Sequence, residues 1–219
     1  MCPMSTAARL HEAETESEPI PPLENGDRLT RDEFERRYWA SPHIEKAELI
    51  EGVVYVASPV NFGKHGLPHG IVMGWLATYV DRHPETELGD NSTLRLDNDN
   101  EPQPDALLRY REGGTSTLDE DEYLVGVPEL AIEVASSSTS IDTHAKKNAY
   151  RRNGIPEYIV WRVRDDAVDW FVLEQGEYVA LQPDASGVIE SRIFPGLRLN
   201  VPALVAMDLS AVMATQRDS

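Results

Sequence analysis

The chain has 219 residues, of which 41% are hydrophobic and 26% are charged, and its 38 acidic and 20 basic residues give a formal net charge of −18. This composition is ordinary for a globular protein. The acidity argues against a protein that coats nucleic acid regardless of sequence, because such binding depends on Lys and Arg replacing counterions. The single cysteine, Cys2, excludes an intrachain disulfide and a cysteine-based zinc cluster.

The N-terminal segment differs in composition from the rest of the chain. Residues 1–28 are acidic, rich in proline and without apolar periodicity, so we expect a disordered tail. The segment lacks the continuous apolar stretch of a secretory signal, and no run in the chain approaches the roughly 20 apolar residues that span a bilayer. We therefore expect a cytoplasmic protein that does not bind membranes, with a single domain over residues 29–219.

Two short elements are predicted directly after this tail. Thr30 and Glu33 have the spacing of a capping box, which favours a short helix beginning at this point. Residues 48–58 form two β-prone runs around Glu51 and Gly52, a pair typical of a tight hairpin turn. The folded part is thus expected to begin with a helix and a hairpin.

The rest of the chain predicts further helices and a series of strands. Residues 69–83 carry apolar side chains at helical spacing, and residues 141–153 predict a second helix that ends at Gly154. A final helix is expected at about residues 202–214, behind Pro202. Strands are predicted at residues 92–96, 104–110, 128–135, 156–163, 167–174, 177–183 and 187–194. This order predicts an α/β sheet flanked by helices, with additional antiparallel strands.

Two acidic residues stand in or beside predicted strands. Asp105 begins one strand behind Pro104, whereas Glu133 interrupts an otherwise apolar run typical of a strand covered on both faces. A carboxylate buried in such a strand is costly without a partner or a metal. If the two strands are neighbours, both carboxylates can bind one hard divalent cation such as magnesium. The alternative is a solvated position for each acid, or an arginine partner for Glu133.

The helix expected after Glu133 carries basic residues. Asp142, Lys146 and Tyr150 follow one another at i+4 spacing, so they can share one face. A lysine near metal-binding acids can orient a water and stabilise the charge of a phosphoryl transition state. The alternative is a surface salt bridge between Asp142 and Lys146. The remaining basic residues of this helix are expected to form an exposed face that contacts substrate phosphates: Lys147, Arg151 and Arg152.

The histidines do not predict a metal site. His65 and His69 have i, i+4 spacing, but Gly66 and Pro68 between them argue against a helix there. The chain also contains no G-x-S-x-G elbow, no Walker loop and no G-x-G-x-x-G motif. No second catalytic motif is therefore predicted.

Several segments of the chain together resemble a known family. The features that carry the resemblance are AELIEG, Pro104-Asp105, PELAIEVASSS, the spacing of Asp142, Lys146 and Tyr150, and NGIPEYIVW. They closely resemble the Uma-two family of restriction endonucleases, within the PD-(D/E)XK nuclease superfamily. The likeness covers about residues 29–215 and is most specific over residues 128–161. It implies the restriction-endonuclease-like fold, a mixed central sheet with helices on both sides.

The resemblance also implies roles for individual residues. Asp105 and Glu133 would bind magnesium, for which manganese is a possible substitute. Glu48 would lie near the metal as a further ligand, and the Val134 carbonyl is another candidate ligand. These acids would form the catalytic set together with Lys146.

One position departs from the superfamily pattern. The superfamily's lysine is expected two residues after Glu133, where this chain has Ala135. In this family the lysine stands in the following helix, which points to Lys146, with Lys147 as the rival candidate.

The resemblance implies a magnesium-dependent endonuclease that hydrolyses DNA phosphodiester bonds. The alternative is a non-catalytic relative of the same fold that acts by binding or assembly. The net charge of −18 favours this alternative, because an acidic nuclease repels its own substrate. DNA is the expected partner, and the aromatic strands near residues 167–181 are a possible homodimer surface.

Overall fold

A mixed sheet forms the centre of the protein. The structure is a computed structural model, and it describes residues 19–136 and 140–217. Within these residues the central sheet has six strands in the order β11-β10-β9-β8-β5-β3. Its strands are β3 (Thr86–Asp90), β5 (Ala106–Tyr110), β8 (Leu130–Ala135), β9 (Glu157–Arg162), β10 (Ala167–Glu174) and β11 (Glu177–Ala180). β8 and β9 are parallel and the other neighbours are antiparallel, which confirms the predicted mixed sheet.

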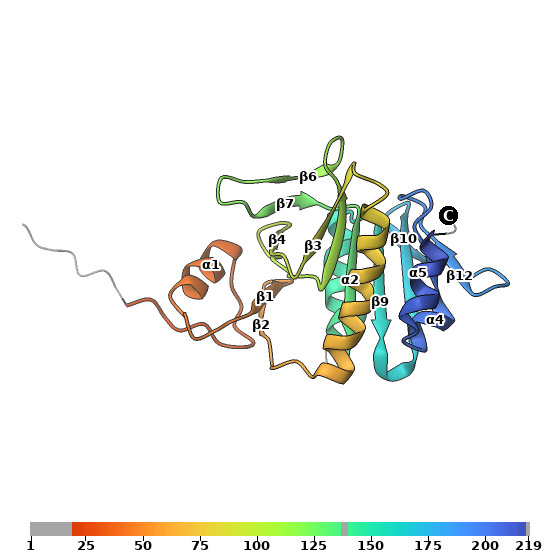
Figure 1. Cartoon of the computed structure of the whole chain (residues 1–219). Helices are drawn as coiled ribbons and strands as arrows, with labels where there is room; N and C mark the ends of the chain where they lie inside the picture. The colour runs from red at the N-terminus through yellow and green to blue at the C-terminus, as the bar shows by residue number, and fades with distance from the viewer. Residues whose placement is uncertain (1–18, 137–139, 218–219) are drawn as a thin grey trace, which may run out of the picture.

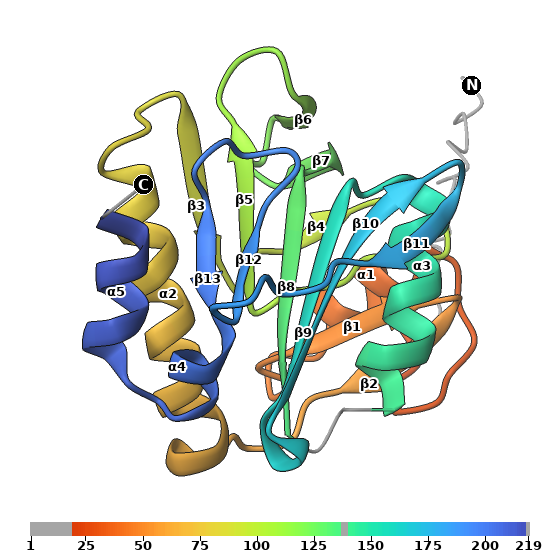
Figure 2. The ribbon, with the colours of Figure 1, turned by 90° about the vertical axis from the view of Figure 1, so that its right-hand side faces the viewer.

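Helices cover both faces of this sheet, as Figures 1 and 2 show. α2 and α5 pack on one face, and α3 packs on the other. The α-helices are α1 (Arg31–Trp39), α2 (Leu67–Val80), α3 (Lys147–Asn153), α4 (Val201–Val205) and α5 (Leu209–Arg217). Three further helical segments are the π-helical η1 (Phe62–Gly66) and η2 (Ile141–Lys146) and the 3₁₀-helical η3 (Val163–Asp165). No helix in the described part of the chain is long and apolar enough to cross a membrane.

Smaller β structures lie beside the central sheet (Figure 2). β1 (Ala47–Ile50) and β2 (Val53–Val56) form a hairpin, and β12 (Val188–Glu190) pairs with β13 (Arg198–Asn200). β4 (Leu94–Arg95), β7 (Leu124–Val127) and β6 (Thr115–Leu118) form a further sheet in the order β4-β7-β6. β3, β6, β7 and β13 were not predicted. The segments of β3 and β6, TELGD and TSTL, are short and carry few apolar side chains, so they give little periodic signal.

The hairpin predicted at residues 48–58 is confirmed. β1 pairs antiparallel with β2, and the two turn residues, Glu51 and Gly52, have φ values of 54° and 71°. Two successive positive φ angles are typical of the type I′ turn, whose twist matches that of the flanking strands. This turn places Glu48 on β1 with its backbone fixed by four register pairs.

The helix predicted after Thr30 is also present, but the predicted capping box is wrong. The Thr30 side chain makes no capping hydrogen bond to α1. Glu33 does not reach back to Thr30, because its carboxylate accepts hydrogen bonds from Arg36 at 2.7 Å and from Arg37 at 2.6 Å. Ion pairs within the helix therefore replace the reciprocal cap.

Part of the predicted disordered tail lies on the hairpin. The prediction for residues 1–18 falls outside the described residues. Leu23 is buried, and the Gly26 amide donates a 2.8 Å hydrogen bond to the Val54 carbonyl. The ordered part of the chain therefore begins before the boundary expected at residue 29.

The C-terminal helix predicted at about residues 202–214 is two helices. α4 ends at Val205 and α5 begins at Leu209. Met207 lies between them with a φ of 56°, a left-handed conformation that a continuous α-helix cannot contain.

The strands near residues 167–181 do not present the aromatic surface on which the predicted homodimer depended. Trp170 is fully buried, and Phe171 and Tyr178 pack against the core cluster beneath α3. Val179 is the large apolar side chain of β11 that is exposed. The homodimer stays a prediction without this support.

A buried carboxyl near β1 gives the fold a pH-dependent stability. Glu101 is 5% exposed and pairs through its backbone with Leu49 of β1. Burial, with a hydrogen bond and negative charge from Glu35, raises the pKa of Glu101 from 4.5 to about 8, although Arg95 opposes this shift. The folded state therefore keeps a proton that the unfolded chain releases above pH 4.5. Stability from this group is complete below that pH and is lost as the pH rises to about 8.

We therefore expect the free energy of unfolding to fall across this range, by up to about 1.4 kcal/mol per pH unit from this group. Glu101→Gln should flatten that fall, because an amide does not titrate. Urea denaturation at a series of pH values measures both slopes. Equal slopes in the wild type and the variant would contradict the assignment.

Candidate functional site

The pairing of β5 with β8 brings the two predicted acids together. Ala106 of β5 lies opposite Ile132 of β8. Because the strands are antiparallel, the next position on each strand brings Asp105 opposite Glu133. The Asp105 carboxylate accepts a 2.7 Å hydrogen bond from the Val134 amide, which holds it against β8. The expectation that the two strands are neighbours is therefore confirmed.

β8 is buried at all six positions, as its apolar sequence predicted. Glu133 is 3% exposed and points to the face that α3 covers, because its neighbours Ala131 and Ala135 belong to the core cluster on that face. Its partner is not an arginine but Lys146. The solvated alternative for Glu133 is therefore excluded.

Lys146 lies at the centre of a group of acids. Its Nζ atom is 2.9 Å from Oε1 of Glu133, 2.9 Å from Oε1 of Glu48 and 3.8 Å from Oδ1 of Asp142. The lysine is 4% exposed, so these contacts form inside the protein and not on its surface. The alternative of a surface salt bridge with Asp142 is thereby excluded.

The helical segment after β8 presents Lys146 to the strand. η2 leads directly into α3, and Gly154 ends this segment with a φ of 85°. The Tyr150 hydroxyl donates to the same Glu133 oxygen as Lys146, at 2.9 Å. The Tyr158 hydroxyl of β9 donates to the Asp142 carbonyl at 2.8 Å. The two tyrosines therefore fix the helical segment formed by η2 and α3. The i+4 spacing of Asp142, Lys146 and Tyr150 places these residues on the side that faces Glu133.

Glu48 reaches the site from the β1–β2 hairpin. Its Oε1 atom accepts a 2.6 Å hydrogen bond from the backbone amide of Gln103, in addition to the contact with Lys146. Gln103 precedes Asp105 by two residues, so this bond ties the hairpin to the start of β5. The structure thus brings together the four residues predicted as the catalytic set: Glu48, Asp105, Glu133 and Lys146.

Burial and the charge of the ion-pair partner shift the pKa values of Glu133 and Lys146 in opposite directions. Burial raises the pKa of the Glu133 carboxyl well above its ordinary value; Lys146 opposes this, while Asp142, Asp105 and Glu48 add to it. Burial alone would lower the pKa of the Lys146 ammonium, but the surrounding carboxylates together raise that pKa well above its ordinary value. Lys146 is therefore protonated at neutral pH and compensates the charge of the acids around it.

Two histidines that were not predicted to form a metal site also lie here. η1 continues into α2 without interruption, so Gly66 and Pro68 do not prevent a helix, and the expectation against one was wrong. Pro68 lies at the point where the π-helical segment passes into α2. The rings of His65 and His69 stack, with their centroids 5.8 Å apart. Their i, i+4 spacing was the available signal.

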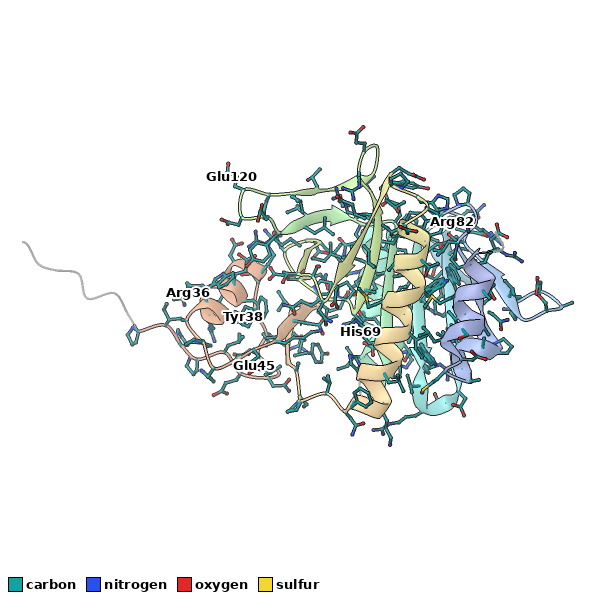
Figure 3. The ribbon with its side chains drawn as sticks, viewed as in Figure 1. Arg36, Tyr38, Glu45, His69, Arg82 and Glu120 are labelled. Carbon is teal, nitrogen blue, oxygen red and sulfur yellow. The ribbon has the colours of Figure 1, made fainter. Side chains whose placement is uncertain are left out.

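Both histidines contact the backbone around the acids. His65 Nδ1 lies 3.1 Å from the Val134 carbonyl, and its Nε2 lies 3.5 Å from Oδ1 of Asp105. His69, on the side of α2 that faces the sheet (Figure 3), lies 2.9 Å from the Asp105 carbonyl and 3.2 Å from Asp90. The histidines therefore position Asp105, and His65 occupies the Val134 carbonyl that was a candidate metal ligand.

The basic residues predicted to contact substrate have partners within the chain. Nζ of Lys147 lies 3.5 Å from the centroid of the Phe171 ring, which rules it out as the rival of Lys146. Arg151 is 3.2 Å from Glu177, and Arg152 is 2.9 Å from Glu51, the turn residue of the hairpin. Their role as a phosphate-binding face stays a prediction.

The donor chemistry of the site fits a hard divalent cation. Four carboxylates, from Glu48, Asp105, Glu133 and Asp142, surround one ammonium, so the group attracts a further positive charge. Oxygen ligands of this kind suit magnesium. As the side chains stand, no three His, Cys, Asp or Glu residues of the described chain converge closely enough to hold a metal ion. Binding would require Nζ of Lys146 to leave at least one of the carboxylates that it bridges.

A cavity of about 600 Å³ lies apart from this group, beside β3 and β5. Arg109 and Arg111 line it, but both contact Glu87, at 3.0 Å and 2.7 Å. None of the four predicted catalytic residues lines this cavity. Both arginines share the Glu87 carboxylate, and the cavity lies apart from the acids around Lys146.

The fold defines a class of protein, the α/β proteins with a mixed central sheet covered by helices on both faces. The crystal structure of "a putative nuclease belonging to DUF820 from Anabaena variabilis" matches with a TM-score of 0.63 and 16% sequence identity, over 82% of this chain and 98% of that one. At this identity the match shows a shared fold. No curated protein matches the sequence.

The sequence itself gives the family. The model of the Uma2 family, described as "Putative restriction endonuclease", matches residues 31–202. The chain therefore belongs to the Uma2 (Uma-two) family. The resemblance seen in the sequence is confirmed.

Proposed function

We propose that the protein is a magnesium-dependent endonuclease that hydrolyses phosphodiester bonds in DNA. The observation that carries this proposal is the buried contact of Lys146 with both Glu133 and Glu48, beside Asp105. A lysine buried among several acids gains little as a stability device, because desolvation offsets most of the attraction. Strongly perturbed ionisable groups gathered in this way are typical of catalytic sites.

The acids would hold the cation. Asp105, Glu133 and Glu48 supply the carboxylate oxygens, and manganese would serve as a substitute for magnesium. When bound, the cation polarises the scissile phosphate and lowers the pKa of a water molecule.

The chain's own residues supply the remaining functions. The Lys146 ammonium stays protonated and can stabilise negative charge on a phosphoryl group in transition. Tyr150 donates to Glu133 and so orients that carboxylate. His65 and His69 hold the Asp105 side chain and backbone in place.

A non-catalytic binding protein of the same fold is the second candidate. The net charge of −18 favours it, as does the way Lys146 closes the space between Glu48 and Glu133. Such a protein would need no cation, and its acids would act only as partners of Lys146.

Cleavage of DNA separates the two candidates. We expect the wild type to cut plasmid or single-stranded DNA when magnesium or manganese is present and not in EDTA. Lys146→Ala and Asp105→Asn should each lower the rate by roughly 100-fold or more, because the first removes the ammonium that stabilises charge on the phosphate and the second removes a carboxylate that holds the cation. Gel electrophoresis of the products measures these rates.

A matched control is Glu120→Gln, which changes an exposed acid between β6 and β7, far from the site (Figure 3). This variant should cut like the wild type. If all four proteins show the same trace activity, that activity comes from a contaminant and the binding protein is the correct candidate.

A further inference from the structure

An exposed apolar segment borders the candidate site. Val60, Phe62 and Leu67 are 70%, 77% and 42% exposed, and they lie within the eight consecutive residues that end at the first residue of α2. His65, in the same segment, contacts Asp105 at the site. Single exposed apolar residues are ordinary, but three together beside a site indicate a contact surface.

Hydrogen bonds to Asn61 order the backbone around Phe62. The Asn61 side chain accepts a hydrogen bond from the Lys64 amide, and the Asn61 carbonyl accepts one from the His65 amide at 2.9 Å. The Phe62 ring lies against Gly66, since a Cβ atom on that glycine would be 3.6 Å from Cδ2 of the ring. Most of the Phe62 side chain is thus presented to solvent.

One cationic side chain lies in η1 with this ring, and a second lies on an element that contacts η1. η1 contacts η3, the short segment that follows β9, so Lys64 and Arg164 stand on neighbouring elements. Both are exposed, and neither forms an ion pair with a carboxylate in the described part of the chain. Arg162 of β9, in contrast, pairs with Asp165 and Asp169. Lys64 and Arg164 can therefore meet a phosphate without first releasing a carboxylate.

We propose that this surface binds an unpaired strand of the DNA substrate; we call it the η1–η3 surface and define it by Val60, Phe62, Lys64, Leu67 and Arg164. A base of the strand stacks on Phe62, and backbone phosphates contact Lys64 and Arg164. Stacking requires a free π-face, which a base in a duplex does not offer and an unpaired base does. The inference rests on the proposed function and specifies its substrate as DNA with an unpaired segment.

Binding measured without cleavage tests this surface. Fluorescence anisotropy in EDTA compares a labelled oligothymidine with a duplex of the same length. We expect the single strand to bind more tightly, and Phe62→Ala to weaken its binding by roughly 5- to 100-fold. Phe62→Tyr should restore binding, because it keeps the aromatic face. The plot of log K against log salt has a negative slope, and Lys64→Ala and Arg164→Ala should each reduce its magnitude by about 0.7.

Trp39→Ala is the matched control, because Trp39 is an aromatic residue of α1 that is 61% exposed and lies outside this surface. It should bind like the wild type. Equal affinity for single strand and duplex, or single-strand binding that Phe62→Ala does not change, would overturn the inference. So would a Phe62→Ala variant that changes only the oligomeric state in size-exclusion chromatography, since the surface would then join two copies of the chain.

The same variants separate this inference from the proposed function. A protein that binds a single strand through Phe62 but does not cut it in magnesium would contradict the nuclease and leave the surface intact. A protein that cuts DNA with unchanged affinity in Phe62→Ala would contradict the surface alone.

Discussion

Lys146→Met should lower the free energy of unfolding by about 3–5 kcal/mol, because it leaves the buried Glu133 carboxylate and the partly buried Glu48 carboxylate without their shared cation. Methionine keeps most of the volume of the lysine side chain, so the loss reports charge and not a cavity. Urea denaturation at neutral pH measures the loss. The unfolding free energy of the variant should recover as the pH falls, because protonation of Glu133 removes the uncompensated charge.

The adjacent lysine provides the matched control. Lys147→Met changes a side chain that lies over the Phe171 ring and contacts none of the acids at the site, so we expect a loss below about 1 kcal/mol. The double variant Lys146→Met/Glu133→Gln should regain part of the stability lost in the single variant, which a double-mutant cycle quantifies. If Lys146→Met is as stable as the wild type at all pH values, the buried pair does not exist in solution.

Magnesium or manganese should raise the melting temperature of the wild type, and Glu133→Gln should abolish the increase. A ligand at about 100 times its dissociation constant stabilises a protein by ~2.7 kcal/mol, which corresponds to roughly 5–10 °C in a chain of this size. Glutamine keeps the shape of the side chain but removes the charge that the cation needs. Differential scanning calorimetry measures the shift.

Any cation screens the repulsion among the negative charges of a protein with a net charge of −18, so this effect requires its own control. Sodium chloride at matched ionic strength should give a smaller shift than magnesium in the wild type. Glu120→Gln should retain the full magnesium shift, because the exposed side chain lies far from Asp105 and Glu133. A wild type whose melting temperature does not respond to either metal would count against a metal site.

Glu133 and Lys146 could be predicted from the sequence because each has a local signal. Glu133 interrupts an apolar run, and Asp142, Lys146 and Tyr150 recur at i+4 spacing. Both patterns arise from neighbours in the chain, and the period of a strand or helix converts them into a face. Identification of Glu48 as a member of the set depended on the family resemblance, because nothing near it in the sequence marks its contact with Lys146.

The histidines were missed for a physical reason. A glycine and a proline between His65 and His69 lower helix propensity, but the helical run from η1 into α2 is held by its neighbours. His65 contacts the Val134 carbonyl, and α2 buries Trp75 and Tyr79 in the core. Packing of this kind overrides local propensity.

The partners of the basic residues could not be read from the sequence either. Lys146 and Lys147 are adjacent, yet one is buried among acids and the other covers Phe171 of β10. Which lysine enters the site depends on the rotation of the helix against β8, and this rotation is fixed by the hydrogen bonds of Tyr150 and Tyr158.

The sequence by itself determined the order of the main helices and strands, the family, and the residues that can carry charge into the core, since these depend on periodicity and side-chain chemistry. Only the tertiary structure decided that Lys146 bridges Glu48 and Glu133, that His65 and His69 hold Asp105, and that Phe62, Lys64 and Arg164 face solvent together. These contacts join residues 13 to 98 positions apart. Contacts at such separations depend on strand pairing and helix rotation, which local sequence does not specify.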